Sequence, residues 1–431
     1  MAGRFENSNA RCVTDMPDFS DSIPVSLYVH VPWCVKKCPY CDFNSHALKS
    51  ELPEAAYVDA LLADLESECA TIASRTVDSV FIGGGTPSLF SPESVARLIE
   101  GIGARVALSS RCEITLEANP GTAEASRFCG FRQAGINRLS IGVQSFDDNV
   151  LVAIGRIHDG RQARAAAEMA RAADFDSFNL DLMYALPGQS VEQALSDIDT
   201  ALELEPTHLS YYQLTLEPNT LFFRHPPKLP AEDSAWRMSQ QGIERMRACG
   251  YHRYEISAFA RAGFECRHNL NYWRFGDYVG IGAGAHGKLT DANRGEITRT
   301  LKHRHPRAYL NAARDRRFEL KREPLARDAL PLEFMMNALR LTAGIDLALF
   351  TARTGVPLAE LSSVLAEAEA EELVEIKGGM LKPTTLGLQF LDDLLLRFAP
   401  AIDRARFPRA TAAAVLPCAS SGDGLILSGD R

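Results

Sequence analysis

A repeated order of apolar run and amphipathic stretch occupies residues 26–215 and constrains the fold more than any other feature. The apolar runs are expected to form six strands, at 26–31, 77–82, 112–118, 136–143, 178–186 and 208–214. The stretches between them are expected to form helices, at 53–70, 92–102, 121–135, 160–173 and 190–204. Near-continuous apolar runs are typical of parallel strands buried on both faces, and parallel neighbours require right-handed crossovers. The fold class expected is therefore α/β, a partial (β/α)6 barrel of the TIM type with its chemistry at the carboxyl ends of the strands.

The rhythm ends at residue 215, and a different organisation follows. A proline-rich connection at 216–230 leads into an expected helix at 233–249 and a strand at 251–257. Beyond residue 324, three helices precede a hairpin around Gly378 and Gly379 and a closing helix, a pattern typical of a winged-helix-like α+β domain. Five divisions are expected: an N-terminal extension (1–25), a barrel (26–215), a barrel extension (216–323), a C-terminal domain (324–398) and a flexible tail (399–431).

Charge and composition argue against several classes of protein. The 431 residues carry a formal net charge of −9, which disfavours general nucleic-acid binding because that role needs a basic face. The acidic stretch 358–373 points the same way and favours contact with a partner protein or a second copy of the chain. No apolar run reaches the ~18 residues of a membrane span, and the first residues lack the apolar core of a signal peptide. A cytoplasmic protein is expected, with peripheral membrane contact left open.

Three cysteines lie within eight positions: Cys34, Cys38 and Cys41, spaced C-x3-C-x2-C. The remaining cysteines are scattered, and a small apolar residue in a reduced interior accounts for nearly all of them. A single zinc ion would need a fourth ligand, which His30 or His46 could supply. A [4Fe–4S] cluster has four irons that each want an outer ligand, so three thiolates leave one iron open to a substrate or cofactor.

The segment YVHVPWCVKKCPYC, residues 28–41, resembles the cluster-binding loop of the radical S-adenosylmethionine (SAM) proteins. It also follows the first expected strand, as in that family. The resemblance implies a barrel of the radical SAM type and a [4Fe–4S] cluster held by the three cysteines. It further implies that SAM chelates the open iron through its amino and carboxylate groups, and that the reduced cluster can cleave SAM to a 5′-deoxyadenosyl radical. Whether this chain uses that cleavage stays open.

Polar residues recur at the ends of the expected strands. Gly83, Gly84 and Gly85 end the second strand, and three glycines allow a ligand to approach the backbone closely. Glu117 and Asp181 belong to apolar strands, where a carboxylate is costly unless it is paired or liganded. These positions resemble those of the oxygen-independent coproporphyrinogen III oxidase group. That resemblance implies the SAM-contacting residues Tyr28, Tyr40, Gly84, Gly85, Thr86, Glu117, Gln144, Arg156, Asp181 and Thr215.

Two departures separate the chain from the oxidases of that group. The oxidases carry a fourth cysteine two residues after the third, where this chain has Phe43. They also begin with a longer segment that contributes to the substrate site, whereas about 25 residues precede the first expected strand here. Oxidative decarboxylation of coproporphyrinogen III to protoporphyrinogen IX is therefore kept only as the alternative function.

A second motif lies at residues 266–287. His268, Asn269, Tyr272 and Trp273 form HNxxYW, which resembles the signature of the HemW-type haem chaperones. A histidine beside aromatic rings can supply an axial iron ligand and a flat apolar wall for a porphyrin, although the same grouping is common in protein cores. Cys266 is the alternative axial ligand. The following GAGAHG matches G-x-G-x-x-G, but without a βαβ unit it favours a loop over the pocket rather than a dinucleotide site.

The second resemblance implies a function for the whole chain. It predicts a haem chaperone that binds a [4Fe–4S] cluster, SAM and haem b as cargo, and that delivers the haem to acceptor proteins. His268, Tyr272 and Trp273 are then the implied haem contacts. A homodimer is compatible with this function.

Overall fold

The computed structural model describes residue 19 and residues 23–72, 74–120 and 127–400. Most of the expected N-terminal extension at 1–25 and nearly all of the expected tail at 399–431 lie outside the described residues, as does the first part of the helix expected at 121–135. Within the described residues, no helix is both long and apolar enough to cross a membrane.

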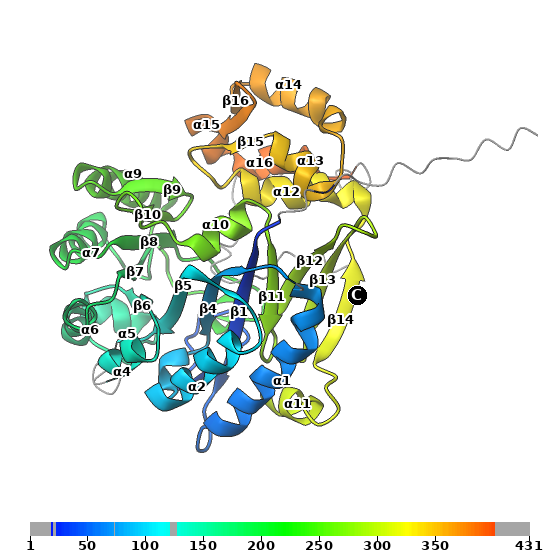
Figure 1. Cartoon of the computed structure of the whole chain (residues 1–431). Coiled ribbons are helices and arrows are strands. Elements are labelled where there is room, and N and C mark those ends of the chain that lie inside the picture. Colours follow the sequence, from blue (N-terminus) through cyan, green and yellow to red (C-terminus); the bar gives the residue numbers. More distant parts are fainter. Residues whose placement is uncertain (1–18, 20–22, 73, 121–126, 401–431) are drawn as a thin grey trace, which may run out of the picture.

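The six expected strands are confirmed, and they pair in parallel in chain order within one large sheet. They are β1 (Val25–Val31), β4 (Val77–Gly84), β5 (Leu108–Ala118), β6 (Arg138–Gln144), β7 (Ser177–Tyr184) and β8 (His208–Gln213). Helices lie around the outer face of this curved sheet (Figure 1), namely α1 (Glu54–Ile72), α2 (Pro92–Gly103), α4 (Phe128–Gln133), α6 (Gly160–Ala172), α7 (Val191–Glu203) and α9 (Glu232–Ala248). The partial α/β barrel is therefore observed.

The sheet extends beyond the six strands on both sides. On one side β10 (Ala258–Ala260) and β9 (His252–Glu255) add antiparallel to β8. On the other side β11 (Asp277–Ile281) pairs in parallel with β1, and β12 (His286–Asp291), β13 (Glu296–Lys302) and β14 (Glu319–Pro324) continue antiparallel. The sequence pattern did not reveal these last four strands, because they are interrupted by glycines and carry charged residues at buried positions such as Lys288 and Lys302.

Short elements connect these layers. They are β2 (Trp33–Cys34) and β3 (His46–Ala47), the 3-10 turns Pro87–Leu89 and Arg327–Ala329, and the helices α5 (Asp148–Ala153), α8 (Leu221–Arg224), α10 (Arg267–Trp273) and α11 (Pro306–Ala312).

The C-terminal domain has the expected winged-helix-like form. Its order is α12 (Leu330–Ala338), β15 (Ile345–Asp346), α13 (Ala348–Thr354), a 3-10 turn (Leu358–Leu361), α14 (Ser362–Ala370), β16 (Val374–Lys377) and β17 (Met380–Pro383). The three strands form a small antiparallel sheet, and Gly378 and Gly379 have φ values of 59° and 83° in the hairpin turn, where glycine is favoured. The single closing helix expected at 384–398 is wrong: the chain breaks at Phe390 (φ −111°, ψ 36°) into α15 (Thr385–Gln389) and α16 (Leu391–Leu396).

Helix α10 joins the barrel to the C-terminal domain at the amino-terminal ends of the strands (Figure 1). Its Trp273 belongs to the apolar core of the C-terminal domain, together with Phe275 and Phe334. The guanidinium of Arg340 lies 4.2 Å from the centre of the Trp273 ring and pairs with the Glu255 carboxylate at 2.9 Å. Aromatic burial and this ion pair therefore hold the two parts together.

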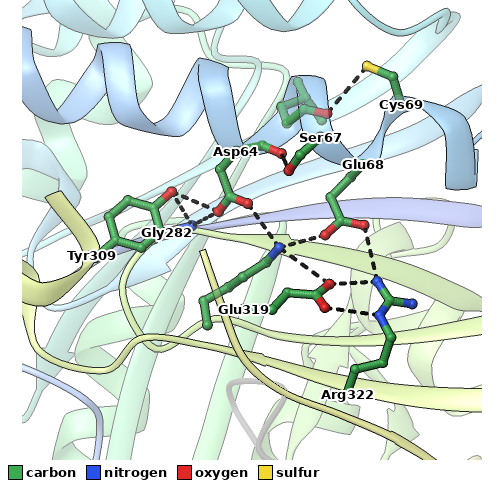
Figure 2. Close-up of polar contacts among 10 residues, drawn as sticks. Asp64, Ser67, Glu68, Cys69, Gly282, Tyr309, Glu319 and Arg322 are labelled. Atoms are coloured by element: carbon green, nitrogen blue, oxygen red, sulfur yellow. Dashed lines mark hydrogen bonds and ion pairs between the residues drawn. The ribbon is translucent and has the colours of Figure 1, made fainter. Parts of the chain in front are cut away.

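A buried ionic network fixes α1 to the added strands, and Figure 2 shows it. Lys302 Nζ of β13 lies 2.9 Å from Asp64 and 2.5 Å from Glu68, and Glu319 and Arg322 extend the network. Burial opposes the charge on Lys302, but Asp64 and Glu68 outweigh it and raise the Lys302 pKa. The lysine is therefore charged, and it is the counter-charge for two carboxylates inside the protein.

We expect Lys302→Ala to lower the free energy of unfolding by about 3–5 kcal/mol, because it leaves buried carboxylates without a counter-charge. The measurement is urea denaturation followed by circular dichroism. The control is Lys321→Ala on the neighbouring strand, whose exposed ion pair with Glu323 predicts a change within about 0.5 kcal/mol. Equal effects of the two variants would contradict the analysis.

Candidate functional site

The three cysteines lie in a loop at the carboxyl ends of the central strands. The short parallel pair β2–β3 closes the loop, with Trp33 opposite His46 and Cys34 opposite Ala47. The end of β4 is bonded to the same loop, since Gly85 N donates to Val31 O at 2.7 Å and Thr86 N donates to Trp33 O at 2.7 Å. The structure therefore brings the cysteine motif and the glycine motif into one unit.

The three thiols are partly buried, and burial sets the protonation of Cys34 and Cys41. Burial raises the pKa of Cys34, and it raises the pKa of Cys41 to about 11. Without a metal these groups are therefore neutral thiols near pH 7, and iron must displace their protons to bind thiolates. Three such donors on one short loop suit a [4Fe–4S] cluster with one open iron.

Neither histidine that could complete a zinc site joins the cysteines in a metal-binding group among the described residues. Both ring nitrogens of His30 are engaged at 3.0 Å, Nδ1 with the Tyr28 hydroxyl and Nε2 with the backbone oxygen of Asn44. The His46 ring packs edge-on against His305, with 5.3 Å between ring centres. Among the described residues, no group of three or more His, Cys, Asp or Glu side chains is arranged to hold a single metal ion. The donor set fits a cluster better than it fits zinc.

The glycine motif is demanded by close packing. At Gly84, whose φ is 113°, an added Cβ would lie 2.5 Å from the His30 ring. At Gly85 it would lie 2.4 Å from the backbone oxygen of Trp33. Gly84 N donates to the Glu117 carboxylate at 2.9 Å, so the motif is also tied to the end of β5. Larger residues would push the cysteine loop away from the sheet.

Two carboxyl groups approach the site from β5 and β7. Burial raises the pKa of Glu117 to about 8, and the nearby Asp181 adds to the shift. Burial also raises the pKa of Asp181, which accepts hydrogen bonds from Asn179 at 2.8 Å and Ser140 at 3.4 Å. Both residues keep part of their surface exposed, so a ligand can reach them. A ligand with an ammonium or hydroxyl group would give Glu117 a further donor besides Gly84 N.

Arg156 links the cysteine loop to the strand ends. Its Nη1 donates to Cys38 Sγ at 3.7 Å, and its Nη2 donates to Asn119 Oδ1 at 2.6 Å. Burial opposes its charge, yet Tyr40 and Cys38 outweigh burial and raise the Arg156 pKa. Asn119 also donates to the Thr86 hydroxyl at 2.8 Å and so bridges Arg156 to the glycine motif. Sequence analysis missed Asn119, although its position two residues after Glu117 places it on the same side of the chain.

The remaining expected SAM contacts differ in how closely they approach this centre. Gln144 ends β6 with φ 70°, a strained value for a non-glycine residue, and accepts a hydrogen bond from the Tyr212 hydroxyl at 2.7 Å. Tyr40 packs beside Phe222 near Arg156. Tyr28 is buried beneath the loop against Phe81. Thr215 lies just beyond β8, and no contact places it with the others.

The HNxxYW residues lie deeper in the molecule than expected. The His268 ring is buried against Phe81, with Nδ1 3.0 Å from the Ser79 hydroxyl and Nε2 3.0 Å from the Tyr272 hydroxyl. Burial lowers the His268 pKa to about 3. Because both nitrogens are occupied and Trp273 belongs to the C-terminal core, these residues form no open porphyrin wall in this conformation. Their role as haem contacts stays a prediction, and it requires α10 to move.

Two further expectations meet the structure in this region. Burial raises the pKa of Cys266 to about 12, and its Sγ lies 3.5 Å from the Glu113 carboxylate, so it is a neutral thiol and a poor axial ligand. GAGAHG packs against His30 and Asn44. Its residues 282–285 form a turn between β11 and β12 that lies behind the cysteine loop, where Gly282 faces the backbone of His30.

Gly85→Ala tests the packing of the glycine motif. We expect it to lower the free energy of unfolding by about 1–3 kcal/mol, because the atom that its Cβ would meet belongs to the backbone of the cysteine loop. In Gly103→Ala, the control near the end of α2, the nearest atom would lie 3.9 Å away, so a gain of up to about 1 kcal/mol is expected. Chemical denaturation measures both, and a stable Gly85→Ala protein would refute the close approach.

The buried His268 predicts a dependence of stability on pH. Its pKa is about 3 in the folded protein and about 6.5 in an unfolded chain, so the unfolded state binds more protons between these values. The free energy of unfolding should therefore rise with pH from 3 to 6.5, by up to about 1.4 kcal/mol per pH unit from this group. His268→Gln should flatten the slope in denaturation curves measured from pH 4 to 7. The exposed variant His225→Gln should leave it unchanged, and equal slopes in all three proteins would contradict the burial.

Comparison with known proteins agrees with this geometry. The model of the radical SAM superfamily matches residues 28–201, and that of the HemN C-terminal domain matches residues 325–390. The chain is similar to the heme chaperone HemW of Escherichia coli strain K12, with 50% identity over 375 residues that cover 87% of this chain and 98% of the relative. It is 48% identical over 379 residues to the heme chaperone HemW of Haemophilus influenzae, with the same coverage of 87% and 98%.

Among solved structures, the coproporphyrinogen III oxidase HemN of Escherichia coli, a radical SAM enzyme, has the same fold. The TM-score is 0.74 at 24% identity, and the match covers 87% of this chain and 90% of the other. At that identity the likeness concerns the fold alone. Because the family models and the close relatives agree along most of its length, the chain belongs to the HemW family of the radical SAM superfamily.

Proposed function

We propose that the protein holds a [4Fe–4S] cluster on Cys34, Cys38 and Cys41 and binds SAM beside it. The observation that carries this proposal is the bonding of a three-thiol loop directly to the glycine motif of β4. When bound, the cluster supplies an open iron that chelates SAM and an electron for its cleavage. The residues proposed to hold SAM are Tyr28, Tyr40, Gly84, Gly85, Thr86, Glu117, Gln144, Arg156, Asp181 and Thr215.

Each group has a chemical task in this proposal. The backbone of Gly84 to Thr86 leaves room for the amino acid part of SAM. Glu117, whose pKa burial raises to about 8, gains a partner when an ammonium group or ribose hydroxyl approaches. Arg156 lies between Cys38 and Asn119, where its planar fork can face a carboxylate. The arrangement therefore suits a zwitterionic ligand next to a cluster.

We further propose that the protein carries haem and delivers it to acceptor proteins in the cytoplasm. Relatives at 50% and 48% identity bear the name heme chaperone, and Phe43 takes the place of the fourth cysteine of the oxidases. The proposed haem contacts are His268, Tyr272 and Trp273. Because His268 is a buried residue of α10, iron ligation there would couple haem binding to a loosening of α10 and the C-terminal domain.

The charge of the exposed surface bears on the choice among the proposed partners. Haem and haem-acceptor proteins are the expected partners, with a homodimer compatible and nucleic acid disfavoured. Support against nucleic acid comes from α14 and the residue after it, where Glu367, Glu369 and Glu371 are exposed.

Anaerobic reconstitution with iron and sulfide tests the cluster. We expect the wild-type protein to take up a full cubane complement with broad brown absorption, and Cys38→Ala to lose it. Cys249→Ala, which changes an exposed cysteine away from the loop, should take up as much iron as the wild type. Equal iron in the Cys38→Ala protein, or a colourless wild type, would refute the cluster.

Parallel haem and oxidase assays on the reconstituted protein decide between the two functions. We expect haem titration to give a saturable Soret band, and His268→Ala to change that band or weaken haem retention while the cluster stays. Incubation with coproporphyrinogen III, SAM and reductant should yield no protoporphyrinogen IX. Product formation at turnover rates would establish the alternative oxidase function, and an unchanged Soret band would remove His268 as the ligand.

A further inference from the structure

Asn44 and Ser45, three and four residues after Cys41, are not among the proposed cofactor contacts. Ser45 is buried, and its hydroxyl lies 3.7 Å from Cys41 Sγ. The same hydroxyl also lowers the pKa of Cys34, against the larger effect of burial. One buried hydroxyl therefore stands between two of the three cysteines.

The direction of these hydrogen bonds follows from the chemistry of a loaded site. A thiolate bound to iron has no proton, so it can only accept, and the Ser45 hydroxyl must donate. The other donors in the site follow the same pattern: Arg156 Nη1 donates to Cys38 Sγ at 3.7 Å, and Thr86 hydrogen-bonds to Cys34. Each of the three sulfurs thus has a donor group beside it, and the one proton of the Ser45 hydroxyl is donated to Cys41.

Asn44 holds Ser45 in place. Its side-chain Nδ2 donates to the backbone oxygens of Ala283 and Arg304, both at 2.8 Å, and its own backbone oxygen lies 3.0 Å from His30 Nε2. The contact is close, because a Cβ on Gly284 would lie 2.2 Å from the Asn44 side chain. Gly284 has φ 84°, so glycine is favoured there on both grounds.

The 282–285 turn, to which Asn44 donates a hydrogen bond, is itself fixed by buried polar groups. Gly282 N donates to Asp64 Oδ2 at 3.2 Å and to the Tyr309 hydroxyl at 3.1 Å, and Figure 2 shows these groups converging from α1 and α11. Ala283 N donates to the Tyr57 hydroxyl at 2.8 Å, which in turn donates to His30 O at 2.8 Å. Asn44 therefore connects the cysteine loop to a buried polar frame.

We propose that Ser45 tunes the reduction potential of the [4Fe–4S] cluster by donating to Cys41, and that Asn44 is the residue that positions it. The inference rests on the proposed cluster. Hydrogen bonds to ligand sulfurs draw charge away from the cluster and favour its reduced form, so they raise the potential. Residues 43–45, which begin at the position of the oxidases' fourth cysteine, therefore have a proposed role of their own.

The first test is a redox titration of the reconstituted full-length protein, followed by electron paramagnetic resonance. Ser45→Ala should shift the midpoint of cluster reduction to a lower potential, because the loss of the hydroxyl leaves more charge on the sulfurs. Ser45→Thr keeps the hydroxyl and should return the midpoint close to the wild-type value. Ser363→Ala removes an exposed hydroxyl on α14 that bonds only to Glu367, and it should change nothing.

The second test measures cluster retention. Asn44→Ala should release iron to a chelator roughly tenfold faster or more, in line with the loss of other residues that support metal ligands. Asn149→Ala, at an exposed asparagine on α5, should release iron at the wild-type rate.

The outcomes separate this inference from the proposed function. A wild-type protein that takes up no cluster overturns both. A wild-type protein with a cluster whose midpoint is unchanged in Ser45→Ala overturns only the tuning, as does an equal shift in Ser45→Ala and Ser45→Thr. Iron release at the wild-type rate from Asn44→Ala overturns the positioning role.

Discussion

The site depends on the parallel pairing of β1 with β4. Their register sets His30 beside Gly83 and Val31 beside Gly84, so both strands end at the same level. The chain that leaves β1 carries the cysteines, and the chain that leaves β4 carries the glycine motif, which donates back to Val31 and Trp33. Glu117 of β5, Gln144 of β6 and Asp181 of β7 then approach a centre whose position this pairing defines.

The two ends of the barrel serve different purposes. At the carboxyl ends, Glu117, Asp181 and Arg156 are polar groups that stay partly exposed, as expected of a place that receives a ligand. At the amino ends, α10 buries His268 and seats Trp273 in the C-terminal domain, as expected of a structural junction. The proposed haem binding therefore requires a larger conformational change than the proposed cluster binding does. Haem ligation by His268 needs the junction to open, whereas the cysteine loop is already at the surface.

Much of the fold and part of the site could be predicted from local pattern. Six apolar runs were long and continuous enough to identify as strands, and the spacing of the cysteines indicated a cluster with an open iron. The strands β11 to β14 were not predicted, in part because Lys288 and Lys302 interrupt the apolar pattern of β12 and β13. These lysines are tolerated inside the protein because they pair with Asp277, Asp64 and Glu68. The sequence pattern did not identify Asn119 and Ser45 as site residues either, because a single small polar residue has no periodicity that would mark it.

The sequence by itself determined the α/β class, the place of the cysteine loop after the first strand and the absence of a fourth cysteine at Phe43. These are local properties, set by side-chain pattern and by the ligand needs of iron. Only the tertiary structure decided that His268 is enclosed and that Asn44 contacts the 282–285 turn. Within that turn, its hydrogen-bond partner Ala283 lies 239 positions away in the sequence. Hydrogen bonds between such distant segments depend on how the whole sheet closes, and no local pattern encodes that closure.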